Sequence, residues 1–212
     1  VHACTRSELD LSVAVGLQDR IEQLVSDVKP DVIVNASAYT AVDKAESEPD
    51  VARLVNASVP GWIAQAAARH SAIMVHYSTD YVFRGDKDSK YVETDPVDPL
   101  SVYGKTKLEG ERAVAAACPR HLIFRTSWVF GAHGGNFLKT MLRLAREREA
   151  LSVVADQFGS PTSASLIAQT TASVLVQMLH APASDPRWGI YHLVADGETN
   201  WHDYASYVIE QA

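Results

Sequence analysis

Short apolar segments without polar alternation are the feature that most constrains this chain. DVIVNA at 31–36, AIMVHYS at 72–78 and HLIFRTS at 121–127 each fit a strand, and LSVV at 151–154 and IYHLV at 190–194 are shorter candidates. Strands that are apolar on both faces belong in a parallel sheet that helices cover. The sequence therefore predicts helices between these strands.

Stretches with helical spacing do separate them. The predicted helices are at 17–29, 49–70, 100–117, 136–149 and 163–180. So regular an alternation predicts an α/β fold with a doubly wound parallel sheet and right-handed crossovers. The one long polar segment, residues 84–99, is expected to be a surface loop near the mouth of a site.

Composition excludes several classes of protein. The 212 residues suffice for one substantial domain, and a net charge of −7 without a basic stripe argues against a nucleic-acid surface. We expect no membrane span and no signal peptide, because no long apolar run occurs. Cys4 and Cys118 lie in no Cys-x-x-Cys, which favours a reducing, cytoplasmic setting. The eight histidines lack ligand spacing, so we predict no metal site.

Polar and aromatic side chains gather where three predicted strands end. They are Ser37, Tyr39, Thr40 and Asp43 after the first strand, Tyr77, Ser78, Thr79, Asp80 and Tyr81 after the second, and Thr126, Ser127 and Trp128 after the third. Ligands of such sheets bind outside the carboxyl ends of the strands. We therefore expect a site at this edge.

A tyrosine and a lysine lie four residues apart in SVYGKTKLEG. On a helix this spacing puts Tyr103 and Lys107 on one face, about one turn apart. The pair alone fits an ordinary surface as well as a proton-transfer site. The neighbouring motifs must decide between these readings.

Five segments together resemble the extended short-chain dehydrogenase/reductase family. They are NASAYTAVDKAESEP, HYSTDYVF, ETDPVDPLSVYGKTKLEGE, HLIFRTSWVFG and DQFGSPTSA, and the resemblance runs from about residue 9 to the end of the chain. It implies a Rossmann-like fold and an NAD(P)H-dependent oxidoreductase that reduces the C4 ketone of a nucleotide-linked 6-deoxyhexose. The expected substrate is dTDP-4-dehydro-L-rhamnose.

The resemblance also implies roles for three residues. Tyr103 would be the general acid that protonates the developing alkoxide. Lys107 would lower the pKa of the tyrosine through its charge and would hold the nicotinamide ribose. Thr79 would hydrogen-bond the carbonyl oxygen.

Further contacts follow from the same resemblance. The expected cofactor-binding residues are Asp10, Leu11, Ala38, Tyr39, Thr40, Tyr77, Tyr103 and Lys107. The expected substrate-binding residues are Val42, Thr79, Asp80, Tyr81 and Trp128. Tyr77 and Trp128 could equally be core aromatics, because large rings fill cores as readily as they line pockets. Arg6 suits the 2′-phosphate of NADPH, with NADH as an alternative.

Two departures from the family pattern stand out. No glycine-rich turn for a pyrophosphate occurs, and the chain opens near where a second strand is expected, so it is expected to be a fragment. We expect residues 1–150 to form a dinucleotide-binding part without its first strand, and residues 151–212 to contribute to a truncated substrate lobe. Ser165 replaces a glutamate with which some members bind magnesium at a dimer interface, so magnesium is doubtful and a homodimer stays open.

Two other functions are compatible with the sequence. One is a non-catalytic regulatory subunit of the methionine adenosyltransferase type, which would not need Thr79, Tyr103 and Lys107 together. The other is a nucleotide-sugar epimerase or dehydratase. Dehydratases typically carry Asp-Glu where this chain has Asp80 and Tyr81.

Overall fold

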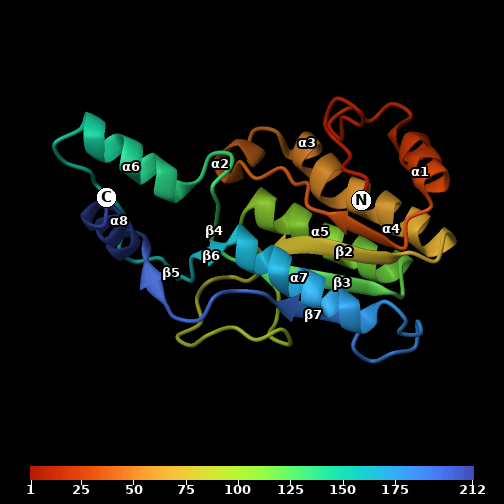
Figure 1. The fold of residues 1–212 in the computed structure, drawn as a ribbon. Helices are drawn as coiled ribbons and strands as arrows, with labels where there is room; N and C mark the ends of the chain where they lie inside the picture. Colours follow the sequence, from red (N-terminus) through yellow and green to blue (C-terminus); the bar gives the residue numbers. More distant parts are fainter. The chain divides into compact units, whose positions relative to one another are not determined.

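The computed structural model describes residues 1–212, which form two compact units (Figure 1). The first, here called the sheet unit, comprises Val1–Arg125 and Leu179–His192. The second, the aromatic unit, comprises Thr126–Met178 and Leu193–Ala212. The functional division at residue 150 stays a prediction.

A four-stranded sheet forms the centre of the sheet unit. Its order is β1-β2-β3-β7, with strands β1 (Val32–Asn35), β2 (Ile73–Thr79), β3 (His121–Thr126) and β7 (Gly189–His192). β1 pairs with β2 in parallel, and β3 pairs with β7 in parallel. Four of the five predicted strands and the α/β class are confirmed.

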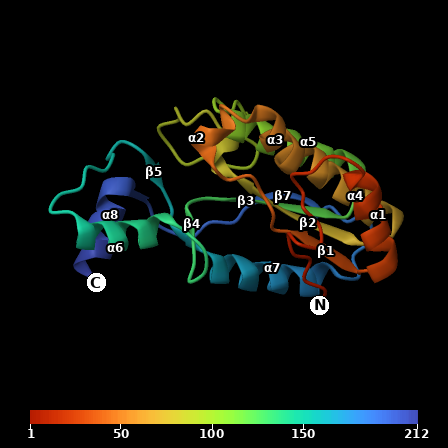
Figure 2. The same ribbon diagram turned by 90° about the horizontal axis from the view of Figure 1, so that it is seen from above.

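Helices α4 (Val59–Arg69) and α5 (Val102–Ala117) cover one face of this sheet (Figure 2). Ala64 and Ala67 of α4 and Val114 of α5 pack on Met74 and Ile123 of the strands. The alanines allow close approach of helix and sheet, and the buried aliphatic surface stabilises the contact. Helix α1 (Leu17–Val28) packs on α4 in turn through a second apolar cluster.

The predicted helix at 49–70 is not continuous. It consists of α3 (Pro49–Arg53), a π-helical turn (Leu54–Ser58) and α4, and a short helix α2 (Val42–Ala45) precedes it. A π turn inserts one residue into the hydrogen-bond ladder and often marks a functional site. Here the turn contains the fully buried Asn56, whose amide binds backbone outside the helix.

The aromatic unit is built from three helices and two small sheets. Its elements are α6 (Phe137–Glu147), α7 (Ala164–Met178), α8 (Trp201–Glu210), the parallel pair β4 (Val129–Phe130) and β6 (Thr162–Ser163), and the antiparallel pair β5 (Phe158–Gly159) and β8 (Thr199–Asn200). Helices α6 and α8 pack around the buried side chains of Met141 and Tyr204.

Two predictions of strands are wrong. Residues 151–154 form no strand: Leu151 and Val153 instead pack on the apolar cluster of α6 and α8, which uses their side chains without a strand partner. The residues before α1 form turns rather than the expected second strand, and the Asp10 carboxylate there accepts hydrogen bonds from the Ser12 amide and hydroxyl. Such local bonds compete with strand pairing. None of the helices combines the length and apolar character needed to cross a membrane.

Candidate active site

Tyr103 and Lys107 lie in the first turns of α5, next to the end of β2. Ser101 caps the helix, since its hydroxyl accepts a hydrogen bond from the Gly104 amide at 3.1 Å. A Cβ on Gly104 would come within 2.2 Å of the Tyr81 carbonyl oxygen. Only glycine therefore lets α5 begin so close to the chain that leaves β2, and this brings Tyr103 to the strand end.

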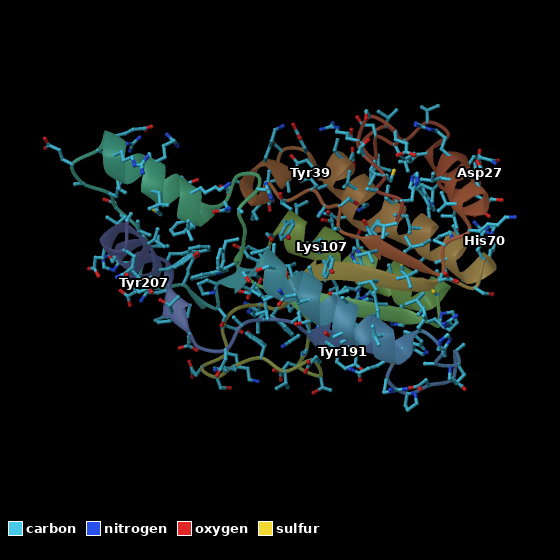
Figure 3. The ribbon with its side chains drawn as sticks, in the orientation of Figure 1. Asp27, Tyr39, His70, Lys107, Tyr191 and Tyr207 are labelled. Carbon is cyan, nitrogen blue, oxygen red and sulfur yellow. The ribbon has the colours of Figure 1, made fainter.

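Lys107 is an almost fully buried cation, with 2% of its surface exposed. Its Nζ donates a hydrogen bond to the Tyr77 carbonyl of β2 at 2.6 Å, and Figure 3 shows the residue beside the sheet. Burial lowers the pKa of Lys107 to about 8, and the charge of Glu111 opposes this shift. Near neutral pH the side chain is therefore mostly an ammonium held inside the protein.

Tyr103 is held by the residues that follow β2. Burial raises the pKa of Tyr103 to about 12, and a hydrogen bond with the Thr79 side chain acts in the opposite direction. The Tyr81 ring meets the Tyr103 ring edge to face, with centroids 5.5 Å apart. The expected lowering of the Tyr103 pKa by Lys107 is not found, because burial dominates and the ammonium lies at the Tyr77 carbonyl. The phenol stays protonated at neutral pH, as a proton donor must.

Thr79 and Asp80 meet at the carboxyl end of β2. Thr79 is 5% exposed, and its Oγ1 accepts from the Tyr81 amide at 3.2 Å and donates to the Asp80 carboxylate at 3.0 Å. Burial, followed by the charges of Asp80 and Asp43, raises the pKa of Tyr81. The four polar residues Thr79, Asp80, Tyr81 and Tyr103 thus form one connected group.

The segment from Ala38 to Thr40 follows β1, and Asn56 positions it. The Asn56 side chain accepts from the Tyr39 amide at 2.8 Å and donates to the Tyr39 carbonyl at 3.1 Å. It also donates to Thr106 Oγ1 on α5 at 3.2 Å. Sequence reasoning missed Asn56, although an amide directly between apolar residues of a helical stretch, in LVNA at 54–57, was a signal.

The hydroxyl of Tyr39 already has a partner. It donates to Glu48 Oε2 at 2.7 Å, and this bond raises the pKa of the tyrosine. Val42 opens α2 and is half-buried. The hydroxyl, the amide and the carbonyl of Tyr39 are therefore all hydrogen-bonded within the protein.

Asp10 and Leu11 lie in the turns before α1. Hydrogen bonds from Ser12, followed by the interaction with Arg6, lower the pKa of Asp10 to about 2. Arg6 Nε donates to the Asp10 carboxylate at 3.2 Å. Leu11 packs on the apolar cluster shared by α1 and α4. These two predicted cofactor-binding residues are thus engaged in local structure.

Trp128 belongs to the aromatic unit. Its ring stacks on Trp201 with centroids 3.5 Å apart, and a Cβ on Gly159 would come within 2.6 Å of the indole. Trp128 has a φ of +46°, a left-handed conformation that costs a non-glycine residue about 1–2 kcal/mol. Strain of this kind persists only where the surroundings impose it, and it is common at ligand sites.

Sequence reasoning also missed a buried ion pair. Glu111 of α5 and Arg125 of β3 are 1% and 4% exposed, and both guanidinium contacts to the carboxylate are shorter than 3 Å, at 2.9 and 2.7 Å. The spacing of Glu111 from Lys107, four residues on α5, was the available signal. No group of three or more His, Cys, Asp or Glu side chains is placed to hold a metal ion, and the Ser165 hydroxyl pairs with Ser163 at 3.1 Å.

Comparison with known proteins identifies the family. The model of the RmlD substrate binding domain matches residues 1–212. The chain belongs to the RmlD substrate binding domain family. The resemblance that the motifs suggested is thereby confirmed.

Named relatives of this RmlD-family chain are dTDP-4-dehydrorhamnose reductases. The protein of Salmonella typhimurium is 56% identical over 91% of this chain and 63% of its own length. The protein of Burkholderia thailandensis is 49% identical over 96% of this chain and 67% of its own length. The chain spans less than two thirds of the length of the Salmonella relative.

Solved structures agree on the fold of the RmlD-family chain. The dTDP-4-dehydrorhamnose reductase of Bacillus anthracis, crystallised in complex with NADP, superposes with a TM-score of 0.86 at 35% identity, covering 99% of this chain and 71% of that one. A reductase ortholog from Clostridium acetobutylicum gives a TM-score of 0.87 at 36% identity, with 97% and 69% covered.

Proposed function

We propose that the protein catalyses the NADPH-dependent reduction of the C4 ketone of dTDP-4-dehydro-L-rhamnose to give dTDP-L-rhamnose. The observation that carries this proposal is the group formed by Tyr103, Thr79 and Lys107 at the carboxyl end of β2. The names of the relatives and the NADP complex of the Bacillus anthracis structure support it.

Tyr103 is the proton donor in this proposal. When the C4 carbonyl is reduced, its π bond breaks and the oxygen takes the proton from the Tyr103 hydroxyl. A pKa of about 12 keeps that hydroxyl protonated beforehand, and Thr79 orients it through their hydrogen bond. To stabilise the charge that develops on the oxygen, the Thr79 hydroxyl would turn from the Asp80 carboxylate, to which it donates in the free protein, and donate to that oxygen instead.

Lys107 is the residue best suited to the nicotinamide ribose. An ammonium has three N–H donors, of which the Tyr77 carbonyl takes one, and ribose hydroxyls are matching acceptors. The segment at residues 38–40, which Asn56 holds in position, is the second predicted cofactor contact. When bound, the nicotinamide supplies the hydride that reduces the ketone carbon.

The substrate contacts stay proposals. Asp80 and Tyr81, which follow Thr79 directly, and Val42 are the predicted sugar contacts of the sheet unit. The indole of Trp128 is predicted as a sugar contact separately, from the aromatic unit. A flat aromatic face suits the C–H groups of a sugar ring. A homodimer and a cytoplasmic location are predictions that accompany this function.

Net consumption of NADPH is the test. The full-length protein is mixed with NADPH and dTDP-4-dehydro-L-rhamnose, and the loss of NADPH absorbance is followed, with dTDP-glucose as a control that lacks the ketone. We expect stoichiometric oxidation with the ketone alone. An epimerase or dehydratase returns the hydride to the sugar, and a regulatory subunit transfers none, so product formation without NADPH loss, or no reaction by folded protein, contradicts the proposal.

A further inference from the structure

The ion pair of Glu111 and Arg125 shares a helix face with the residues proposed to react. Tyr103, Lys107 and Glu111 follow one another at four-residue intervals along α5, so their side chains lie on one face. Lys107, Glu111 and Arg125 are each less than 5% exposed, at 2%, 1% and 4%. Buried charges are costly unless they compensate one another, which makes these three residues interdependent.

Arg125 holds the carboxylate from outside the helix. Its Nε donates to Glu111 Oε1 at 2.9 Å and its Nη2 donates to Oε2 at 2.7 Å, a bidentate geometry that fixes the carboxylate in place. The guanidinium lies 5.0 Å from the centre of the Phe83 ring and reaches the Glu93 carbonyl at 3.5 Å. Glu93 in turn accepts from the His192 amide of β7 at 2.8 Å. Strand β3 and its neighbours therefore set the position of the Glu111 charge.

Lys107 has a different set of contacts. Its Nζ bonds the Tyr77 carbonyl at 2.6 Å, and it belongs to none of the ion pairs. Its charge interacts with Glu111 on α5 and with His76 on β2, and Arg125 is paired with Glu111. Tyr103 lies four residues before it on the same helix. His76 is fully buried, and burial followed by the charge of Lys107 holds its pKa well below the usual value, so it is neutral. Glu111 is thus the anion that favours the ammonium.

We propose that Glu111 and Arg125 are positioning residues for Lys107. The Arg125 guanidinium clamps the Glu111 carboxylate one helical turn from the ammonium, where it keeps Lys107 charged without capturing its N–H groups. Those groups then remain directed to the Tyr77 carbonyl and to the cofactor ribose. The inference rests on the proposed function for the role of Lys107.

Glu111→Gln is the first test. Without the carboxylate charge, the ammonium loses the interaction that raises its pKa from the value set by burial. Two pH profiles measure this loss: kcat/KM, and NADPH affinity determined by fluorescence titration. The alkaline limb of each profile, where the value declines as pH rises, should move to lower pH by about one unit or more. Glu109→Gln is the matched control: Glu109 lies on the same helix in an exposed ion pair with Arg53 at 2.9 Å, and both limbs should stay at the parental pH.

Arg125→Gln should move the limb the other way. The released carboxylate would then act on Lys107 without a competing cation, which raises the pH of the alkaline limb. It would also draw the ammonium from the Tyr77 carbonyl and weaken NADPH binding at neutral pH. Arg125→Lys keeps the charge, so it should leave the limb within a few tenths of a pH unit of the parent. A merely structural ion pair predicts lower melting temperatures in these variants with no shift of either limb.

If Glu111→Gln fails to fold, a double variant can still test the inference. Glu111→Gln combined with Arg125→Met removes both buried charges together, which proteins commonly tolerate. Circular dichroism checks the fold, and the limb should again lie at lower pH. A folded Glu111→Gln or double variant with parental limbs overturns the inference. A parent that binds NADPH but oxidises none overturns the proposed function instead, while the pH dependence of NADPH binding still tests the ion pair.

Discussion

The sheet unit and the aromatic unit bury different chemistry. The sheet unit encloses the charged or titratable side chains of His76, Lys107, Glu111 and Arg125 among aliphatic residues. In the aromatic unit the buried polar residues are Thr126, Ser127, Thr162 and Thr171, and none of them carries a charge. Rings fill its centre: Trp128 and Phe137 each contact both Trp201 and Tyr204.

Buried charges and buried rings suit different tasks. Moving a proton needs groups of fixed charge and position, and a paired sheet with a capped helix supplies both. The two-residue strands of the aromatic unit provide few ladder bonds, so stacked rings give much of its order. We therefore expect changes in the sheet unit to act on rate and cofactor binding, and changes in the aromatic unit to act on stability and substrate affinity.

Tyr103→Phe should give the largest effect. The change removes only the hydroxyl, so the fold should persist while turnover falls by about 10²- to 10⁴-fold, the range of general acid catalysis. Steady-state rates of NADPH oxidation measure it. Tyr207→Phe on α8 is the control and should turn over normally, because this residue is 63% exposed. Near-parental turnover in a folded Tyr103→Phe protein would remove this residue from the mechanism.

Trp128→Ala tests the other unit. Truncation of a packed tryptophan costs about 3–5 kcal/mol of unfolding free energy, and the stack on Trp201 predicts a loss of this order. Chemical denaturation followed by circular dichroism measures it, and KM for the sugar should rise while NADPH affinity changes little. Trp188→Ala is the control, because that half-buried indole lies under Arg120 and should cost less. A selective rise in KM without a loss of stability would show that Trp128 contacts the substrate and does not stabilise the fold.

Lys107→Ala should affect binding and rate together. Hydrogen bonds from a charged group contribute about 1.5–3 kcal/mol, so NADPH affinity should fall about 10- to 100-fold, and turnover should fall with it. Isothermal titration gives the affinity. An unchanged NADPH affinity with reduced turnover would separate the two roles and leave Lys107 with the proton-transfer step alone.

Gly159→Ala should give the smallest effect. Its backbone conformation is open to alanine, but the new Cβ would meet the Trp128 indole at 2.6–2.9 Å, and overpacking costs about 1–3 kcal/mol. Gly135→Ala in the same unit meets no atom within 4 Å and is the matched control. Equal melting temperatures for the two variants would show that the indole moves aside without strain.

The sequence by itself determined the parallel sheet and its main helices. β-branched runs and helical periodicity are local signals, and they located β1, β2, β3, β7 and helices α1, α5, α6 and α7 to within a few residues. The sequence also predicted that Tyr103 and Lys107 lie on one helix face, because side chains four residues apart on a helix are neighbours. Their proposed chemistry came from the resemblance and stays a prediction.

Other features depended on the tertiary structure. Two-residue strands such as β5 and β8 leave no periodic pattern, since only their pairing defines them. The apolar segment at 151–154 fits the pattern of a strand. In the structure Leu151 and Val153 pack on the aromatic cluster of α6 and α8 and pair with no strand. The break at Asn56 likewise follows from a partner, the Tyr39 backbone, seventeen residues away in sequence.

The charges of the site were also decided in three dimensions. Sequence spacing predicts that Lys107 faces Tyr103, but desolvation and a distant carbonyl determine what each side chain does. Burial raises the pKa of Tyr103 to about 12, and the Tyr77 carbonyl, thirty residues earlier, receives the ammonium. The physical reason is that helical periodicity depends on near neighbours in the chain, whereas burial and electrostatic energy depend on every group that folding brings close.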